Sequence, residues 1–422
     1  MNLLNSFSFE LPTKIEYGVG VTERLPEIIA NENFSNLLVV TDDGVAGSGL
    51  LERVADALDG QQLKWEVFDR VEPNPKDYNV QAGTEIVRRL GADCLLAVGG
   101  GSPIDCAKAV AVVARQGGAA RDYEGPHNMG PDVLPLIAIP TTAGTGSEVT
   151  FSSVITDSTA KYKFSIRDPK IAPRFALIDP EMTLTMPPGL TASTGMDALT
   201  HAIEAFTARA AEPLADAAAL YAIELIAAHL RNAVSDGRNL EARAGMLLGS
   251  VLAGIAFSHS DVGSVHCIAE ALGGKYDTAH GVCNAVVLPA VMEYNMDYCR
   301  ERYARIASAM GISYASVEEG ARSAVEAVKQ LAVDVAHDFV SLRDSETGRA
   351  ALEWAGGALG LLYRVERLAE DGTVLFSALT ARPRYVLPAS TEPSGLWRVT
   401  ALDPAGRSLG RSAERATPDE LL

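Results

Sequence analysis

Cysteine and positive charge are both scarce in this chain. Only 5 of its 422 residues are cysteine, and Cys94, Cys106, Cys267, Cys283 and Cys299 form no C-x-x-C pair. An odd number of scattered cysteines fits a disulfide framework poorly and indicates a reducing compartment. The 36 lysines and arginines form no basic run, and the net charge is −18. Nucleic acid and anionic membranes would repel such a chain, so we expect its partners to be small molecules or further copies of itself.

Targeting and membrane segments are also lacking. The opening residues, MNLLNSFSFE, show neither the charged nor the apolar region of a signal peptide, and no uninterrupted apolar run reaches the length that spans a bilayer. We therefore expect a cytoplasmic protein. A hydrophobic content of 47% over 422 residues is typical of a globular chain with two or three domains.

Short apolar runs alternate with longer amphipathic ones between residues 36 and 140. NLLVV, DCLLAVGG and LPLIAIP have the composition of buried strands, whereas LLERVADAL and VQAGTEIVRRL have helical periodicity. This alternation predicts a parallel sheet covered by helices. A hairpin and a further strand are expected within residues 152–179, followed by helices to about Val335. We expect an α/β dinucleotide-binding domain at residues 1–185 and an all-α metal-binding domain at 186–337.

The composition changes after His337. Residues 338–422 contain ten arginines and no lysine, and the alternating stretches LYRVERL and TVLFSAL flank the turn-forming pair Asp371 and Gly372. This pattern predicts an atypical, β-leaning C-terminal segment.

A glycine-rich stretch, AVGGGSPIDCAK, follows one of the expected strands. Glycines 99–101 allow close approach of a ligand, and Ser102 and Pro103 are expected at the N-cap and first position of a helix, with Asp105 completing a capping box. The free N–H groups and the helix dipole would favour a phosphate there. A well-capped helix without a ligand is the alternative, and the spacing is not that of the G-x-G-x-x-G fingerprint.

A second loop, PTTAGTGSEVT, follows a later strand. It places the hydroxyl groups of Thr141, Thr142 and Thr145 at the carboxyl edge of the sheet, where open α/β folds bind ligands. Two such loops on one edge favour a dinucleotide site. Asp42 ends an earlier strand and could accept hydrogen bonds from an adenosine ribose, which favours NAD over NADP, although aspartate is also a common turn residue there.

The helix GMDALTHAIEAF carries an unusual polar stripe. Asp197, His201 and Glu204 lie on one face of it, opposite an apolar face. A lone acid and histidine at this spacing are more often solvated than metal-bound. Two further histidines, His266 and His280, bracket another predicted helix, and one carboxylate with three imidazoles suits a divalent Fe, Zn, Mn or Co ion.

Four stretches in order, GGGSPIDCAK, PTTAGTGSEVT, GMDALTHAIEAF and DTAHGVCNA, together resemble the signatures of the iron-containing (group III) alcohol dehydrogenases. The resemblance covers about residues 5–335 and implies a catalytic cleft between the two domains. It implies that His266 and His280 are catalytic residues. The implied metal ligands are Asp197, His201, His266 and His280. The implied dinucleotide contacts are Asp42, Asn74, Gly100, Gly101, Ser102, Thr141, Thr142, Thr145 and Lys163.

The resemblance also implies an activity. A divalent ion, Fe²⁺ first and Zn²⁺ as the alternative, would act as a Lewis acid while hydride passes between a primary alcohol or diol and NAD. A homodimer or higher homo-oligomer is expected. Three alternatives stay open: an enzyme similar to glycerol dehydrogenase, a lyase similar to dehydroquinate synthase, and a catalytically silent variant.

The chain departs from the family in two places. Glu270 stands where many relatives have a further pocket histidine, four residues after the third ligand, and no role is assigned to it. Residues 338–422 match nothing in the family, so either this segment is genuine or a frame change or fusion occurs near His337. In the second case, helix faces upstream would lose their covering layer.

Overall fold

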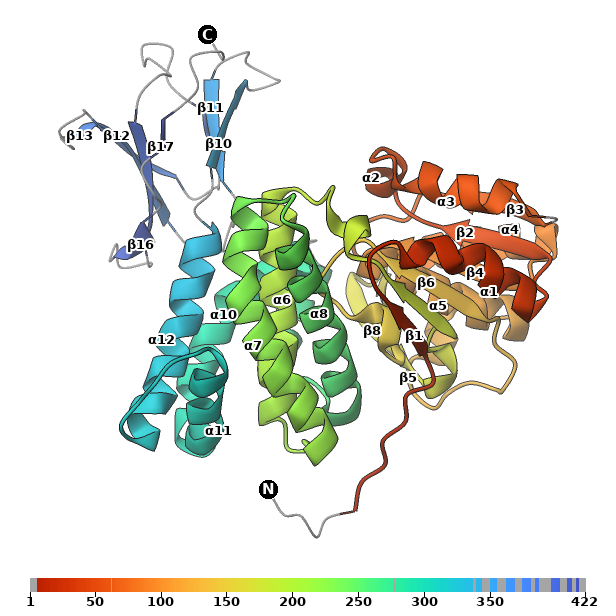
Figure 1. Ribbon diagram of the computed structural model, residues 1–422, viewed down its shortest axis with the longest axis horizontal. Helices are drawn as coiled ribbons and strands as arrows, with labels where there is room; N and C mark the ends of the chain where they lie inside the picture. The colour runs from red at the N-terminus through yellow and green to blue at the C-terminus, as the bar shows by residue number, and fades with distance from the viewer. Residues whose placement is uncertain are drawn as a thin grey trace.

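The structure is a computed structural model. It describes residues 6–61, 63–276 and 278–336, together with the backbone of strands between residues 339 and 416. In Figure 1 an α/β body lies beside a body of packed helices. The fold class expected from the sequence, an α/β nucleotide-binding domain followed by an all-α domain, is confirmed.

A six-stranded parallel sheet forms the centre of the first body. Its strand order is β1-β9-β6-β4-β2-β3. The strands are β1 (Lys14–Tyr17), β2 (Asn36–Val40), β3 (Lys64–Phe68), β4 (Cys94–Gly99), β6 (Leu136–Pro140) and β9 (Phe175–Ile178). Every residue of β4, β6 and β9 is buried, as expected for strands covered on both faces.

Helices cover both faces of this sheet. They are α1 (Leu25–Glu32), α2 (Asp43–Ala46), α3 (Leu50–Asp59), α4 (Asp77–Leu90) and α5 (Gly101–Gln116). One apolar core lies under α4 and α5, and a second lies under α1 and α3. The parallel register aligns the carboxyl ends of β4 and β6, since Gly99 is paired with Pro140. The two loops expected to bind the dinucleotide therefore leave the sheet side by side.

The hairpin expected after these strands is present. Strands β7 (Ser152–Asp157) and β8 (Tyr162–Arg167) are antiparallel, and the short strand β5 (Gly125–Pro126) pairs with β8. This small sheet carries Lys163 and lies against α5, because Ser153 Oγ donates to the Asp105 carbonyl oxygen at 2.7 Å.

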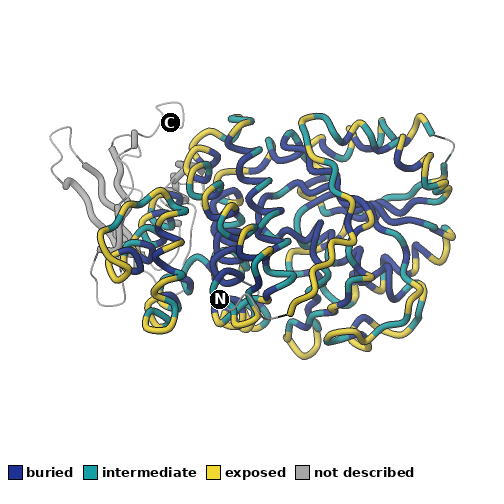
Figure 2. Tube along the Cα trace, turned by 60° about the horizontal axis from the view of Figure 1, so that its bottom comes forward, coloured by how far each residue is buried: buried dark blue, intermediate teal, exposed yellow. Residues whose placement is uncertain are grey.

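Seven helices form the second body within the described residues. They are α6 (Pro188–Thr207), α7 (Pro213–Ser235), α8 (Leu240–Ser260), α9 (Ser264–Tyr276), α10 (His280–Tyr294), α11 (Met296–Ala309) and α12 (Val317–Ala336). Helix α6 is buried from Gly195 to Phe206, and Figure 2 shows buried residues gathered in the interior of the helical body. By length and composition alone, α7 and α8 could cross a bilayer, but 39% and 61% of their most apolar stretches are buried inside the protein.

The C-terminal segment contains strands, as the alternating pattern predicts. They are β10 (Phe339–Arg343), β11 (Ala350–Trp354), β12 (Leu362–Leu368), β13 (Val374–Thr380), β14 (Arg384–Val386), β15 (Leu396–Leu402), β16 (Ser408–Arg411) and β17 (Arg415–Ala416). All their pairings are antiparallel, including that of β12 with β13. The expected turn at Asp371 and Gly372 lies outside the described residues.

Candidate metal centre and dinucleotide cleft

Helix α6 supplies the first half of the candidate metal centre. Asp197 and His201 lie one turn apart, and their exposed fractions are only 2% and 5%. Glu204 follows on the same face and is 6% exposed. A solvated stripe would be open to water, so the alternative of a merely wet face is ruled out. Buried ionisable groups of this kind require partners or an ion.

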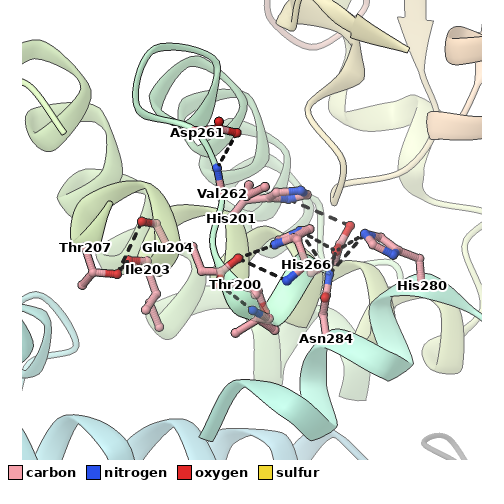
Figure 3. Close-up of polar contacts among 12 residues, drawn as sticks. Thr200, His201, Ile203, Glu204, Thr207, Asp261, Val262, His266, His280 and Asn284 are labelled. Carbon is pink, nitrogen blue, oxygen red and sulfur yellow. Dashed lines mark hydrogen bonds and ion pairs between the residues drawn. The ribbon is translucent and has the colours of Figure 1, made fainter. Parts of the chain in front are cut away.

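Two other helices bring the remaining histidines to the same place. His266 lies in the first turn of α9, and His280 is the first residue of α10. Asp197 Oδ1 is 3.9 Å from His266 Nε2 and 3.7 Å from His280 Nε2. Asp197 Oδ2 is 4.0 Å from His201 Nδ1. Figure 3 shows the side chains of His201, His266 and His280 converging from the three helices.

The geometry fits a divalent ion. The donor atoms of Asp197, His201 and His266 all lie within 4.8 Å of one another. Ligand atoms placed tetrahedrally at about 2.0–2.2 Å from an ion would be about 3.3–3.6 Å apart, so the most widely separated of these atoms would close by about 1.2–1.5 Å on binding. Nδ1 of His201, the ring nitrogen that lies 4.0 Å from Asp197 Oδ2, is buried and has no hydrogen-bond partner among the described residues. Such an orphaned nitrogen is expected at a site built for a cation.

The protonation states also suit metal binding. Burial lowers the pKa of His201 to about 4 and that of His280 to about 3, so both imidazoles are neutral at pH 7. Burial alone would raise the pKa of Asp197, but the neighbouring imidazoles of His201, His280 and His266 bring it below its ordinary value. One ionised carboxylate and neutral imidazoles are the forms that coordinate metals.

Sequence reasoning missed Asn284, which is fully buried at the centre of the site. Its amide nitrogen donates to Asp197 Oδ1 at 2.6 Å and lies 3.2 Å from His266 Nε2 and 3.3 Å from His280 Nε2. Asn284 therefore holds three expected ligands near one point. Its position one helical turn after His280 was the available signal.

The helix after the glycine loop begins two residues earlier than the sequence suggests. Gly100, not Ser102, is the N-cap of α5, and no side chain caps this end. A Cβ at position 100 would lie 2.9 Å from Thr142 Oγ1, and one at 101 would lie 2.6 Å from Thr145 Cγ2. Glycine is thus required because the second loop packs directly against the first. The uncapped N–H groups of α5 stay available to a phosphate.

Asp105 has a different role from the predicted capping box. Its carboxylate accepts hydrogen bonds from Ser147 Oγ and from the Val154 backbone N–H. Lys108, fully buried one turn later, donates to Ser147 Oγ at 3.1 Å and to Thr150 Oγ1 at 2.9 Å. Burial lowers the pKa of Lys108 to about 8. These contacts tie α5 to the second loop and to β7.

The remaining expected dinucleotide contacts lie further along the same cleft. Asp42 is the N-cap of α2, and its Oδ1 accepts from the Val45 backbone N–H at 2.9 Å. Asp42 therefore has a local structural role, that of a helix cap, at the end of its strand. Lys163 Nζ donates to Asn74 Oδ1 at 2.7 Å. Asn74 has a left-handed backbone with φ of 53°.

One cleft of about 1730 Å³ joins the two halves of the site. This volume exceeds that of an ordinary small-molecule pocket, so the cleft can hold a dinucleotide together with a substrate. All the residues expected to bind metal or dinucleotide line it. They are Asp42, Asn74, Gly100, Gly101, Ser102, Thr141, Thr142, Thr145, Lys163, Asp197, His201, His266 and His280.

Glu270 and His259 also line this cleft. Burial raises the pKa of Glu270, against the opposing influence of His266 and Lys163. His259, near the end of α8, stacks on Phe9 with ring centroids 3.9 Å apart. Its Nε2 lies 2.9 Å from the Glu10 carbonyl oxygen. His259 thereby anchors the N-terminal segment to the helical body.

Comparisons with known proteins agree with this architecture. The family model described as iron-containing alcohol dehydrogenase matches residues 12–180, and the model of the C-terminal part of the Fe-containing alcohol dehydrogenase family matches residues 191–353. The second match runs past residue 335, where the resemblance was expected to end.

Individual relatives cover most of the chain. A choline dehydrogenase of Bacillus subtilis (strain 168) is 42% identical over 333 residues, which make up 78% of this chain and 83% of that protein. An NAD-dependent methanol dehydrogenase of Bacillus methanolicus is 39% identical over 325 residues, or 76% of this chain and 85% of that protein. A crystal structure of a 1,3-propanediol oxidoreductase matches with a TM-score of 0.76 and 40% identity, covering 78% of this chain and 87% of that one. This protein belongs to the iron-containing alcohol dehydrogenase family.

Proposed function

We propose that this protein transfers a hydride between a primary alcohol or diol and NAD, and reduces the aldehyde or ketone in the reverse direction. One observation carries the proposal: Asp197, His201 and His266 converge within 4.8 Å on the wall of the cleft that the two nucleotide-type loops also line. A hydride-transferring site needs its substrate-activating centre and its dinucleotide in one water-poor cavity.

The ligand set assigned to the ion is Asp197, His201, His266 and His280, with Fe²⁺ as the first expectation and Zn²⁺ as the alternative. When bound, the ion supplies Lewis acidity and NAD supplies the hydride acceptor. The chain's own residues bind and orient. The N-terminus of α5 would hold the pyrophosphate, and Thr142 and Thr145 pack against Gly100 and Gly101. His201 is held in place by stacking on Phe257, with ring centroids 4.4 Å apart.

We further infer that residues 1–185, 186–337 and 338–422 are the units of the chain, and that the enzyme is a cytoplasmic homodimer. The N-terminal segment supports self-association, because Phe7 and Leu11 are large apolar side chains that are 49% and 40% exposed. An extended segment with one apolar edge is suited to contact another copy.

The test is an assay of NADH formation by protein reconstituted with Fe²⁺ or Zn²⁺. Primary alcohols, diols and glycerol are compared, each with NAD and with NADP. The proposal expects metal-dependent NADH formation from primary alcohols or diols and a preference for NAD. Oxidation of glycerol alone, redox-neutral conversion of a substrate, or NADH binding without turnover would each contradict it and would favour one of the three alternatives above.

A further inference from the structure

We infer that Glu204 is a positioning residue for the metal centre: it fixes the orientation and tautomer of His266 while holding the start of α9. The inference rests on the proposed function, because His266 is positioned for the ion assigned above. Glu204 lies on the same face of α6 as Asp197 and His201 but is not itself assigned as a ligand. One face of α6 would thus supply two metal ligands and also the residue that positions a third ligand, His266.

The contact between Glu204 and His266 is short and buried. Glu204 Oε2 lies 2.6 Å from His266 Nδ1 (Figure 3). The two residues are 6% and 3% exposed. A carboxylate can only accept at this nitrogen, so Nδ1 carries the proton and the lone pair resides on Nε2. Nε2 is the nitrogen that faces Asp197. The hydrogen bond therefore selects the tautomer that presents a lone pair to the ion.

The same carboxylate also satisfies the first turn of α9. Glu204 Oε1 accepts from the Val265 backbone N–H at 2.8 Å, and Oε2 lies 3.4 Å from the His266 backbone nitrogen. These donors have no partner within their own helix. Since His266 is in that turn, Glu204 holds both the backbone and the ring of this ligand. Ring and backbone cannot then shift independently.

Charge balance supports a link to the ion. Asp197 and Glu204 are two buried carboxylates, and their only ion-pair partners among the described residues are histidines. A divalent cation beside these two carboxylates would offset their buried negative charge. Buried charge without compensation is strongly unfavourable.

Gly263 leaves room for this arrangement. A Cβ at position 263 would lie 2.7 Å from Glu204 Oε1, so Gly263→Ala should push the carboxylate off His266 without removing it. This gives a second, independent way to disturb the contact. Glu204→Gln is the first way, because the amide either donates to Nδ1, which moves the ring proton to Nε2, or accepts more weakly than a carboxylate.

Glu212 offers a matched control. It is a buried glutamate, 5% exposed, whose carboxylate accepts from the backbone N–H groups of Leu214 and Ala215 at the start of α7. No histidine is among its hydrogen-bond partners in the described part of the chain. Glu212→Gln therefore removes a buried carboxylate cap and leaves the metal ligands untouched.

The experiment measures dissociation constants of Co²⁺ and Zn²⁺ by chelator competition, with the visible spectrum of the Co²⁺ form and the NADH affinity as further readouts. We expect 10–100-fold weaker metal binding and an altered Co²⁺ spectrum in Glu204→Gln and in Gly263→Ala, with NADH affinity retained. Glu212→Gln should bind metal within twofold of the wild type, even where its thermal stability falls.

Two results would overturn the inference. Metal affinities within twofold of the wild type in folded Glu204→Gln and Gly263→Ala would show that Glu204 acts only as a helix cap. Equal weakening in Glu212→Gln would show a general effect of lost stability. If the wild-type protein takes up neither ion, the proposed function falls as well, so the two failures are distinguishable.

Discussion

At the scale of single residues, Asp197 has the most demanding position, since it is the only carboxylate among the described residues that lies within 4.0 Å of a ring nitrogen of all three histidines. It lies 3.7–4.0 Å from the nearest ring nitrogen of each. We expect Asp197→Ala to reduce retained metal to background and to abolish turnover, because three neutral imidazoles leave the cation without a charged ligand. Metal analysis and the NADH assay measure both effects.

The matched control for this prediction is His127→Ala. The His127 side chain is 75% exposed and pairs with Asp168 rather than with the cluster. The His127→Ala protein should retain metal. Both His127→Ala and Asp197→Ala should keep the NADH affinity of the wild type. Full metal content in folded Asp197→Ala would contradict the assigned ligand set.

Glu148 makes a prediction about pH. It is 1% exposed, its Oε1 has no hydrogen-bond partner among the described residues, and burial raises its pKa from 4.5 to about 7. Between pH 4.5 and about 7, the Glu148 carboxyl is protonated in the folded protein but ionised in the unfolded chain. The contribution of Glu148 to the free energy of unfolding is therefore full below pH 4.5 and falls, by up to about 3 kcal/mol, as the pH rises through 7.

Glu148→Gln stays neutral and should remove this fall. Urea unfolding at pH 5 and pH 8 measures it: the variant should gain stability over the wild type at pH 8 and show little difference at pH 5. If the free energy of unfolding changed equally between pH 5 and pH 8 in the wild type and in Glu148→Gln, the raised pKa of Glu148 would be contradicted.

At the scale of elements, Lys108 connects helix α5 to the second nucleotide loop. It contacts residues 39 to 44 positions away in the sequence. Lys108→Met removes the donor to these acceptors and the cation that lies 3.9 Å from the Asp105 carboxylate, so we expect a loss of about 3–5 kcal/mol in the free energy of unfolding. Because the loop would no longer be held against Gly100 and Gly101, NADH affinity should fall by more than metal affinity.

Urea unfolding and NADH fluorescence titration measure these two effects. Lys170→Met is a suitable control, since the Lys170 side chain is 42% exposed and pairs with Asp168. Unchanged NADH affinity in a folded Lys108→Met protein would show that the loop keeps its shape without this tie.

The elements differed in how far they could be predicted. Strands β2, β4 and β6 follow from continuous apolar runs that only a doubly covered sheet can bury. Strand β1 was missed, because its four residues, KIEY, lie at the sheet edge and are too few to establish a periodic pattern. The start of α5 was misplaced because a glycine, with no capping side chain, holds the N-cap position.

The site was less predictable than the fold. The spacing of Asp197 and His201 indicates one face of a helix, but nothing local indicates that α9 and α10 bring His266 and His280 to it. The family resemblance supplied those assignments. The contacts of Lys108 and Glu204 also depend on packing between distant segments, which periodicity does not encode.

At the scale of the whole molecule, the two bodies meet through backbone contacts. A Cβ on Gly146 in the second loop would lie 2.7 Å from Gly254 Cα in α8, and one on Gly254 would lie 2.9 Å from the Gly146 carbonyl oxygen. Nucleotide loop and metal-binding helices therefore touch without intervening side chains. Ligands in the cleft contact both bodies at once and should stabilise them together.

Metal removal should consequently lower the stability of the whole protein. An ion that binds only the folded state at 100 times its dissociation constant contributes about 2.7 kcal/mol. We expect the melting temperature to fall after chelation and to recover when Fe²⁺ or Zn²⁺ is added back, and calorimetry measures both changes. Asp197→Ala should melt at the same temperature with and without metal. If chelation lowered the melting temperature of Asp197→Ala as much as that of the wild type, the stabilising ion would be bound at another site.

The most direct test of the central claim is X-ray absorption at the metal edge of the reconstituted protein, combined with its metal stoichiometry. We expect one ion per chain, coordinated by three imidazole nitrogens and a carboxylate oxygen at about 2.0–2.2 Å. A first shell of water oxygens without imidazole scattering, or the same spectrum from Asp197→Ala, would contradict it.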